Sequence, residues 1–252
     1  MDNGQTSLTW YGHACVEIHT PGGATVLLDP WFGNPRSPIA AADVPKCDVM
    51  LVSHGHFDHL GSGPRGVREA DALEIARRTG PAWPCIHELS LWLEDRLAGT
   101  EVEIIGMNKG GTVRTHGLEI TMVHADHSAG DWSGAGDGPL YLGEPVGFVI
   151  RLEDGSAIYY TGDTALFGDL ALVGEIHHPD LAILPIGGHY TMGPADAARA
   201  ARLIGARELL PVHYGTFPIL AGTPAELRAA LAASGASDVV VHEPAPGETI
   251  RR

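Results

Sequence analysis

Three histidines and one aspartate lie within six consecutive positions of the chain, directly after the apolar run 48–52. They are His54, His56, Asp58 and His59. We expect the apolar run to be a buried strand and the cluster to lie in the loop at its carboxyl end, where open α/β sheets place ligand sites. Because zinc in proteins takes imidazole nitrogen and carboxylate oxygen as ligands, the cluster predicts a metal site.

The spacing within this cluster indicates two ions rather than one. His54 and His56 are two residues apart, so on an extended segment their side chains point the same way and can hold one ion together. Asp58 and His59 lie beyond a turn and face another direction, which favours a second ion. Each ion needs further ligands, and we expect these from distant strand ends.

Three apolar runs end in suitable polar side chains. The run 118–123 leads to His124 and His127, the run 157–161 leads to Asp163, and the run 208–212 leads to His213. Each run delivers a candidate ligand where the strand is expected to stop. Strand alternation alone leaves the choice between His124 and His127 open.

Three further polar residues have two interpretations each. His13 and Asp29 lie at early strand boundaries, where they would either orient ligand imidazoles or form a hydrogen-bonded structural pair. His189 follows a buried strand and precedes a helix. The backbone amides there could cradle an anion, with His189 as a catalytic acid or substrate contact. The alternative is a loop histidine that caps local backbone.

The elements expected to position these residues alternate along the chain. Strands are expected at 8–11, 16–19, 25–29, 48–53, 85–87, 102–105, 112–114, 118–123, 146–152, 157–161, 181–185, 208–212 and 239–241. Helices are expected at 67–79, 89–97, 165–175 and 194–204, with a last one starting at 224. The glycine-rich segment 128–145 has little periodicity and is expected to be a mobile loop over the site. The pattern predicts two sheets packed face to face with helices outside, in one domain spanning 1–252.

Composition limits the partners and the compartment. Sixteen basic against thirty-one acidic residues give a net charge of −15, which disfavours long nucleic acids but permits a small anionic substrate. No apolar run approaches the length of a membrane span, and the first residues do not resemble an export signal. Three widely spaced cysteines fit reduced thiols, so we expect a cytoplasmic protein.

The ordered set of motifs resembles the metallo-β-lactamase superfamily. In particular, it is similar to the branch that resembles L-ascorbate-6-phosphate lactonase and is usually labelled metal-dependent hydrolase. The resemblance covers nearly the full length. Its motifs are Gly12-His13-Ala14, Leu28-Asp29-Pro30, the segment 53–61, Asp126-His127-Ser128, Thr161-Gly162-Asp163-Thr164, Thr191-Met192-Gly193-Pro194 and Pro211-Val212-His213-Tyr214.

The resemblance implies a fold and a ligand set. The fold would be a four-layer αββα sandwich of the α/β class, with two metals in the cleft between the sheets. His54, His56 and His127 would hold the first ion; Asp58, His59 and His213 would hold the second. Asp163 would bridge them, and the Asp-His-Ser context favours His127 over His124. Two other branches of the superfamily fit less well. The antibiotic-hydrolysing enzymes usually offer a cysteine to the second ion, and no cysteine of this chain lies near a ligand motif. The flavodiiron branch tends to carry glutamate where this chain has His56.

These observations together predict a metal-dependent hydrolase. The ions are expected to be zinc, with manganese, iron or nickel as alternatives for such nitrogen and oxygen sites. A metal-bridged hydroxide would attack a carbonyl or phosphorus, while Asp58 would orient it or shuttle its proton. The expected substrate is a small ester-like molecule, with a lactone favoured. The alternatives are a small phosphodiester and a non-catalytic metal-binding sensor or scaffold. A homo-oligomer is compatible with this interpretation.

Overall fold

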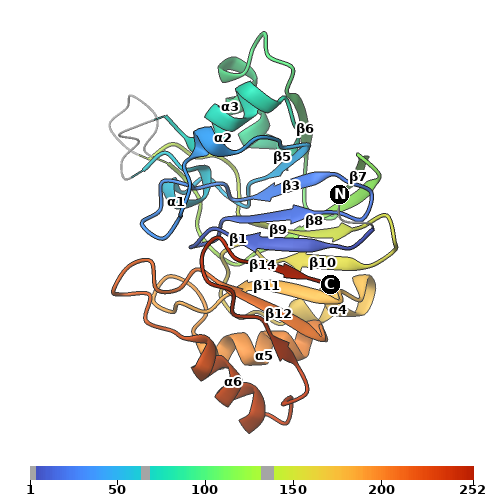
Figure 1. Cartoon of the computed structure of the whole chain (residues 1–252), viewed down its shortest axis with the longest axis vertical. Coiled ribbons are helices and arrows are strands. Elements are labelled where there is room, and N and C mark those ends of the chain that lie inside the picture. The colour runs from blue at the N-terminus through green and yellow to red at the C-terminus, as the bar shows by residue number, and fades with distance from the viewer. Residues whose placement is uncertain (1–3, 64–68, 132–138) are drawn as a thin grey trace.

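Two mixed β-sheets lie at the centre of the molecule, with helices on both outer sides (Figure 1). The computed structural model describes residues 4–63, 69–131 and 139–252. The first sheet has the order β14 (Thr249–Arg251), β1 (Ser7–Trp10), β2 (Val16–His19), β3 (Thr25–Leu28), β4 (Val49–Leu51), β5 (Ala82–Ile86) and β6 (Glu103–Met107). The second has the order β13 (Val240–Val241), β12 (Glu208–Val212), β11 (Leu181–Pro185), β10 (Ala157–Tyr160), β9 (Val146–Arg151), β8 (Leu118–His124) and β7 (Thr112–Thr115).

The helices follow the parallel strands of each sheet. They are α1 (Phe57–Leu60), α2 (Asp71–Thr79), α3 (His87–Arg96), α4 (Leu170–His177), α5 (Pro194–Ile204) and α6 (Pro224–Ala233), with a short 3-10 turn η1 (Ala41–Asp43). Figure 1 shows α2 and α3 beside the first sheet and α4, α5 and α6 beside the second. This arrangement agrees with the expected αββα layers.

Both sheets are built on one plan. The strands from β14 through β1 and β2 to β3 pair antiparallel, and those from β3 to β6 pair parallel. In the second sheet β7 to β10 pair antiparallel, and β10 to β13 pair parallel. Helices can cover the parallel strands on their outer face, so the central parallel strands β4 and β11 are apolar, and every residue of both is buried. The carboxyl ends of β4, β10 and β12 then meet between the sheets.

Local sequence signals account for several helix ends. Thr223 and Glu226 form a reciprocal capping box at the start of α6, with Pro224 as its first residue. Gly80 and Gly205 adopt left-handed backbone conformations just after α2 and α5, as the ends of these helices require.

The structure corrects the expected start of α4, which begins at residue 170 instead of 165. The preceding residues bond to other loops. The amide of Ala165 donates to the carbonyl of Asp126, and the carbonyl of Thr164 accepts from the amide of Met192. These contacts hold the segment after β10 in a non-helical conformation, which periodicity does not reveal.

Two strands also differ from expectation. β5 starts three residues earlier than expected and includes Pro84, which lacks an amide hydrogen. The strand tolerates this proline because its pairing with β4 is limited to Ala82 and Val49, while the remainder pairs with β6. β14 is unexpected because its residues lack an apolar pattern; it forms by pairing with the edge of β1.

Two expectations fall partly outside the described ranges. The expected helix 67–79 corresponds to α2 from Asp71 onward, and residues 67 and 68 are not described. The expected mobile loop 128–145 includes the undescribed residues 132–138; its described flanks are joined by a β-bridge between Asp131 and Leu140. Across the described ranges, no helix has the length and apolar character needed to cross a bilayer.

Candidate metal centre

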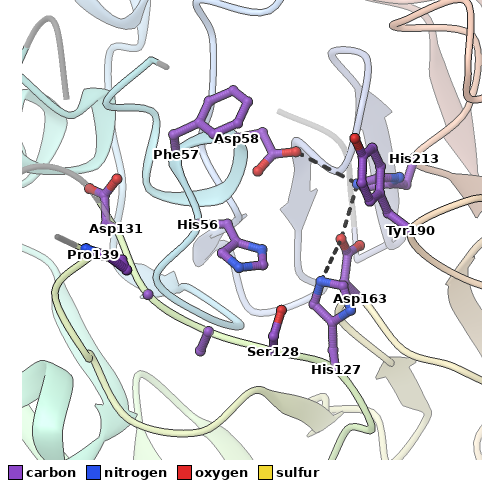
Figure 2. Close-up of a pocket in the computed structure, with 12 residues that line it drawn as sticks. His56, Phe57, Asp58, His127, Ser128, Asp131, Pro139, Asp163, Tyr190 and His213 are labelled. Carbon is purple, nitrogen blue, oxygen red and sulfur yellow. Dashed lines mark ion pairs between the residues drawn. The ribbon is translucent and has the colours of Figure 1, made fainter. Parts of the chain in front are cut away.

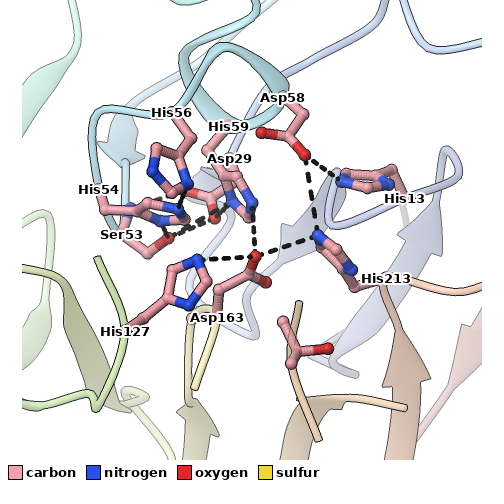
Figure 3. A network of polar contacts seen from close by, with 12 residues as sticks. His13, Asp29, Ser53, His54, His56, Asp58, His59, His127, Asp163 and His213 are labelled. Atoms are coloured by element: carbon pink, nitrogen blue, oxygen red, sulfur yellow. Dashed lines mark hydrogen bonds and ion pairs between the residues drawn. The ribbon is translucent and has the colours of Figure 1, made fainter. Parts of the chain in front are cut away.

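Histidine and carboxylate side chains that lie far apart in the sequence converge between the sheets, as Figure 3 shows. They form two adjoining groups, and within each group the candidate ligand atoms lie within 4.8 Å of one another. One group is His54, His56 and His127; the other is His13, Asp58, His59 and His213. Below, these are called the imidazole group and the mixed group.

Asp163 connects the two groups. Its Oδ2 atom lies 3.0 Å from His213 Nε2 and 3.2 Å from His59 Nε2, both in the mixed group. The same oxygen lies 3.7 Å from His127 Nε2 in the imidazole group. One carboxylate therefore faces both groups, as a bridging ligand would.

The imidazole group consists of neutral rings. His54 Nε2 and His56 Nδ1 are 2.9 Å apart, and His54 Nδ1 lies 2.9 Å from Ser53 Oγ. Burial, together with the neighbouring histidines, lowers the pKa of His54 well below its ordinary value and that of His56 to about 4. Burial also lowers the pKa of His127. Uncharged imidazoles keep a nitrogen lone pair free, which is the form that binds metal.

The mixed group carries opposite charges. Burial alone would raise the pKa of the Asp58 and Asp163 carboxyls, but hydrogen bonds and charge interactions with histidines hold both well below their ordinary range. Burial alone would lower the pKa of His213, but Asp163 and Asp58 raise it to about 9. The pKa of His59 is likewise raised well above its ordinary value, mainly by Asp163 and Asp29, against the effect of burial. Without metal, this group is a network of buried ion pairs.

Asp29 orients His59 from behind. Its fully buried carboxylate accepts hydrogen bonds from the Ser53 amide (2.7 Å) and the Ser53 hydroxyl (2.6 Å). It also accepts short hydrogen bonds from His59 Nδ1 and from the Tyr160 hydroxyl. Because Nδ1 is occupied by Asp29, His59 presents Nε2 to the site, a common arrangement for metal-binding histidines. The expectation that Asp29 orients an imidazole agrees with this geometry.

His13 has a different role from the one expected. It neither orients an imidazole nor pairs with Asp29; its Nε2 lies 3.0 Å from Asp58 Oδ2, and its Nδ1 lies 3.0 Å from Thr216 Oγ1. Its ring centroid is 4.0 Å from that of His213, and burial lowers its pKa to about 4. His13 is therefore a fourth side chain of the mixed group.

Left-handed backbone conformations recur at this site. His13, Asp29 and His213 have φ angles of 51°, 41° and 55°. Such values are uncommon outside glycine and cost on the order of 1–3 kcal/mol each. The surrounding contacts impose them: the amide of His213, for example, donates to the carbonyl of His13 over 2.8 Å. The fold thus holds these three residues of the candidate site in backbone conformations that the chain would rarely adopt by itself.

The sequence left open whether His124 or His127 is the candidate ligand, and the two side chains lie in different surroundings. His127 belongs to the imidazole group. His124 is exposed, with Nδ1 3.2 Å from Lys109 Nζ and its ring edge-on to Phe167. The geometry therefore agrees with His127 as the candidate ligand. His124 lines a neighbouring groove.

His189 lies outside the cavity, although it was expected to act as an acid or substrate contact. Its side chain is exposed, and Tyr190 lines the cavity instead. The expected anion site is not supported either. The amides of Gly188, Tyr190 and Met192 donate hydrogen bonds to backbone carbonyls and so do not point at a ligand. The positive φ of His189 (60°) turns the chain so that the next residue faces the site.

A cavity of about 470 Å³ opens over the two groups, as Figure 2 shows. This volume is typical of sites for small molecules. Its described lining is His56, Phe57, Asp58, His127, Ser128, Ala129, Gly130, Asp131, Pro139, Asp163, Tyr190 and His213.

Sequence reasoning missed four side chains that shape the site: Ser53, Phe57, Tyr160 and Tyr190. Ser53 and Phe57 lie inside the histidine cluster, so proximity was a usable signal. Tyr160 and Asp29 are far apart in the sequence and meet only because β10 faces β3 across the sandwich. No local pattern could reveal that contact.

The donors present fit divalent metal ions. Seven of the side chains were expected as ligands, and all seven face the region between the two groups: His54, His56, Asp58, His59, His127, Asp163 and His213. Neutral imidazoles and ionised carboxylates are ligands for zinc and for other borderline metals. Buried imidazoles packed this closely would stabilise a protein core less well than apolar side chains do. Their convergence is therefore better explained by metal binding.

Comparison with protein families and relatives gives a consistent result. A model described as beta-lactamase superfamily domain matches residues 24–214. A UPF0173 metal-dependent hydrolase of Koribacter versatilis is 42% identical over 250 residues, which cover 99% of this chain and 99% of that protein.

Solved structures are similar over the whole chain. Igni18, a metallo hydrolase from Ignicoccus hospitalis, superposes with a TM-score of 0.83 at 34% identity, covering 98% of both chains. An isothiocyanate hydrolase from Delia radicum gut bacteria superposes with a TM-score of 0.69 at 20% identity, covering 97% of this chain and 98% of that one. The second likeness concerns the fold alone. The expected metallo-β-lactamase fold is confirmed.

Proposed function

Because this chain belongs to the UPF0173 family of metal-dependent hydrolases in the beta-lactamase superfamily, we propose that it hydrolyses a small ester-like substrate, with a lactone favoured, at a dinuclear metal centre. The observation that carries the proposal is the carboxylate of Asp163, which lies within 4 Å of histidines in both groups.

In this proposal each group holds one ion. His54, His56 and His127 bind the first; Asp58, His59 and His213 bind the second; Asp163 contacts both. Zinc suits these ligands, and manganese, iron or nickel also accept them. The whole chain, 1–252, would act as one hydrolase domain. The buried, unpaired thiols of Cys15, Cys47 and Cys85 support a reducing compartment, the cytoplasm.

When bound, such a pair of ions supplies a bridging hydroxide near neutral pH and an electrophilic contact for the acceptor oxygen. Asp58 lies in the cavity wall with Oδ2 3.0 Å from His13 Nε2. It is ionised and partly exposed to the cavity, so it would accept the proton that remains on the attacking hydroxide and pass it toward the leaving oxygen. His13 holds the carboxylate in place through this contact.

The preference for a lactone rests on the resemblance to the lactonase branch. In a lactone only the ring ester has to reach the candidate metal centre. When that ester is hydrolysed, the leaving oxygen stays in the same molecule as the new carboxylate. The cavity volume of about 470 Å³ accommodates a molecule of that size.

The test combines metal analysis with turnover. We expect purified protein loaded with zinc or manganese to bind about two ions per chain and to open a simple lactone. Asp163→Asn should keep the fold but lose turnover, and Asp126→Asn, an exposed neighbour of His127, is the control. Turnover of a generic phosphodiester without lactone opening would indicate the phosphodiesterase instead. Full metal loading without either activity would favour a sensor or scaffold.

A further inference from the structure

The cavity over the metal centre has an apolar side. Phe57, Ala129 and Pro139 contribute hydrocarbon to its lining, and the ring of Tyr190 adds an aromatic surface. Figure 2 shows Phe57 and Pro139 on one side, with Tyr190 and His213 on the other. A substrate whose polar bond reaches the histidines and carboxylates would therefore extend its remaining part along apolar groups.

Phe57 is held firmly in its position. It is the first residue of α1 and follows His56 directly, so its backbone is fixed by the same turn that places the candidate ligands. Its ring packs edge-on against Trp31 at 5.6 Å between centroids, and Trp31 stacks on Phe217 at 6.1 Å. Trp31 is buried, whereas Phe57 remains partly exposed toward the cavity.

A partly exposed aromatic ring beside polar groups of a cavity can serve as a contact surface for a ligand. Ligand pockets combine such apolar surfaces with a few convergent polar groups, and the apolar surfaces bind the hydrocarbon part of the ligand. Tyr190 is 60% exposed on the opposite side, and its ring lies at right angles to that of His189, with 4.5 Å between the ring centroids. The two rings can contact one substituent from two sides.

The apolar side of the cavity favours an uncharged substituent. Asp58 and Asp163 belong to the candidate metal centre together with His213; outside that centre, the charged side chain of the described lining is Asp131, and no lysine or arginine contributes to that lining. The Asp131 carboxylate is buried and accepts hydrogen bonds from Ser62 Oγ at 3.0 and 3.2 Å. An anionic substituent placed beside Phe57 and Pro139 would meet no lysine or arginine of the described lining, and its desolvation against these apolar groups costs free energy.

We propose that the substrate carries an uncharged alkyl or aryl substituent next to its hydrolysed bond, and that Phe57 and Tyr190 select it. This inference rests on the proposed function, to which it adds the chemistry of the substituent. Phe57 supplies the apolar contact surface, and Tyr190 closes the opposite side. Substrates bearing a carboxylate or phosphate in that place are poor ones.

The first experiment measures binding without turnover. Hydroxamates chelate divalent ions through their polar head, so a matched series reports on the substituent. We compare acetohydroxamate, phenylacetohydroxamate and the monohydroxamate of succinate by calorimetry on the metal-loaded protein. We expect the phenyl compound to bind about tenfold more tightly than the methyl compound, and the carboxylate compound to bind no better than the methyl one.

Variants assign the preference to Phe57. Phe57→Ala should reduce the phenyl-to-methyl ratio of binding constants to about twofold, and Phe57→Leu should give an intermediate ratio. Metal content is measured alongside, so that a variant with an intact centre is distinguished from a misfolded one. Phe167→Ala is the matched control, because Phe167 is also partly buried but its ring contacts that of His124, which lines the neighbouring groove. Tyr190→Phe and Tyr190→Ala separate the hydroxyl from the ring.

The second experiment measures selectivity in turnover. The ratio of kcat/KM for a phenyl-substituted butyrolactone to that for unsubstituted butyrolactone should exceed about ten in the parent protein and fall in Phe57→Ala. Equal binding of the three hydroxamates, tighter binding of the carboxylate compound, or a ratio unaffected by Phe57→Ala would overturn the inference. Absence of lactone opening by metal-loaded protein that still prefers the phenyl hydroxamate would instead overturn the proposed function alone.

Discussion

The two groups of the candidate metal centre share one loop but differ in charge and burial. The imidazole group takes His54 and His56 from this loop and is neutral, with His56 and His127 partly exposed to the cavity. The mixed group takes Asp58 and His59 from the same loop, is almost fully buried, and contains charged pairs with Asp163. The same short stretch of sequence therefore produces two different environments.

The difference arises from the residues behind each group. The imidazole group is supported mainly by Ser53, a neutral hydrogen-bonding residue. The mixed group is supported by the carboxylate of Asp29 behind His59, and within the group the imidazole of His13 contacts Asp58. The first group is therefore ready to bind a cation at neutral pH, whereas the second must exchange protons for it. Each prediction below tests this contrast.

The largest effect is expected from Asp163, the residue common to both groups. Asp163→Asn removes the negative charge that pairs with His59 and His213, so both ions lose a ligand at once. We expect turnover to fall more than about 100-fold, beyond the losses typical of residues behind a metal site. Elemental analysis should show fewer than two ions per chain, and unchanged occupancy would refute the bridging assignment.

Single-histidine variants should separate the groups. His56→Ala should empty the imidazole group and leave about one ion in the mixed group, while His213→Ala should do the reverse. Elemental analysis combined with the absorption spectrum of a cobalt-substituted sample distinguishes the two environments. If either variant lost both ions completely, the groups would be a single cooperative site, and the contrast between them would disappear.

Proton release provides a third test. The pKa values of His54 and His56 are lowered, so both are already deprotonated at pH 7 and bind without releasing protons. The pKa of His213 is raised to about 9 and that of His59 is also raised, so both must lose protons to bind. Metal affinity of the mixed group should therefore increase as the pH rises toward 9, while that of the imidazole group stays nearly constant. Calorimetry of the two single-histidine variants in buffers of different ionisation enthalpy measures this directly; equal release from both would contradict the assignment.

The smallest effect is expected from Tyr160→Phe. This variant removes one hydrogen bond to Asp29, so His59 is held less firmly and metal affinity of the mixed group should fall about three- to tenfold. The imidazole group should be unaffected. Tyr159→Phe is a close control, because the Tyr159 hydroxyl is also buried but has no hydrogen-bond partner among the described residues. Similar losses in both variants would mean that packing, rather than Asp29, is responsible.

Much of the fold was predictable because local patterns coincide with tertiary roles. The apolar runs before His54, Asp163 and His213 end at the centre because parallel strands direct their carboxyl ends to one side. Turn and capping residues such as Thr223 and Pro224 likewise mark a helix start without reference to the remainder of the chain. Short-range rules were sufficient at these positions.

The remaining features depend on contacts between distant segments. The contact of His13 with Asp58 requires the first β-hairpin and the histidine loop to meet, and spacing alone suggested other roles for His13. The late start of α4 follows from backbone hydrogen bonds to Asp126 and Met192. Tyr190 and not His189 lines the cavity, in a loop where His189 has a positive φ angle. None of these three features changes the local pattern of apolar and polar residues, so none could be predicted from it.

The carboxylate of Asp29 has a wider consequence for the molecule. It follows β3 in the first sheet, yet it accepts a hydrogen bond from Tyr160 in the second, and nearby the amide of Val146 donates to the carbonyl of Ser53. The candidate metal centre therefore also lies where side chains and backbone groups of the two sheets contact each other. Separating the two sheets would move the candidate ligand side chains apart. An ion bound there would contact residues of both sheets and would therefore stabilise their packing. Loss of metal binding and loss of the packing between the sheets should accordingly occur together.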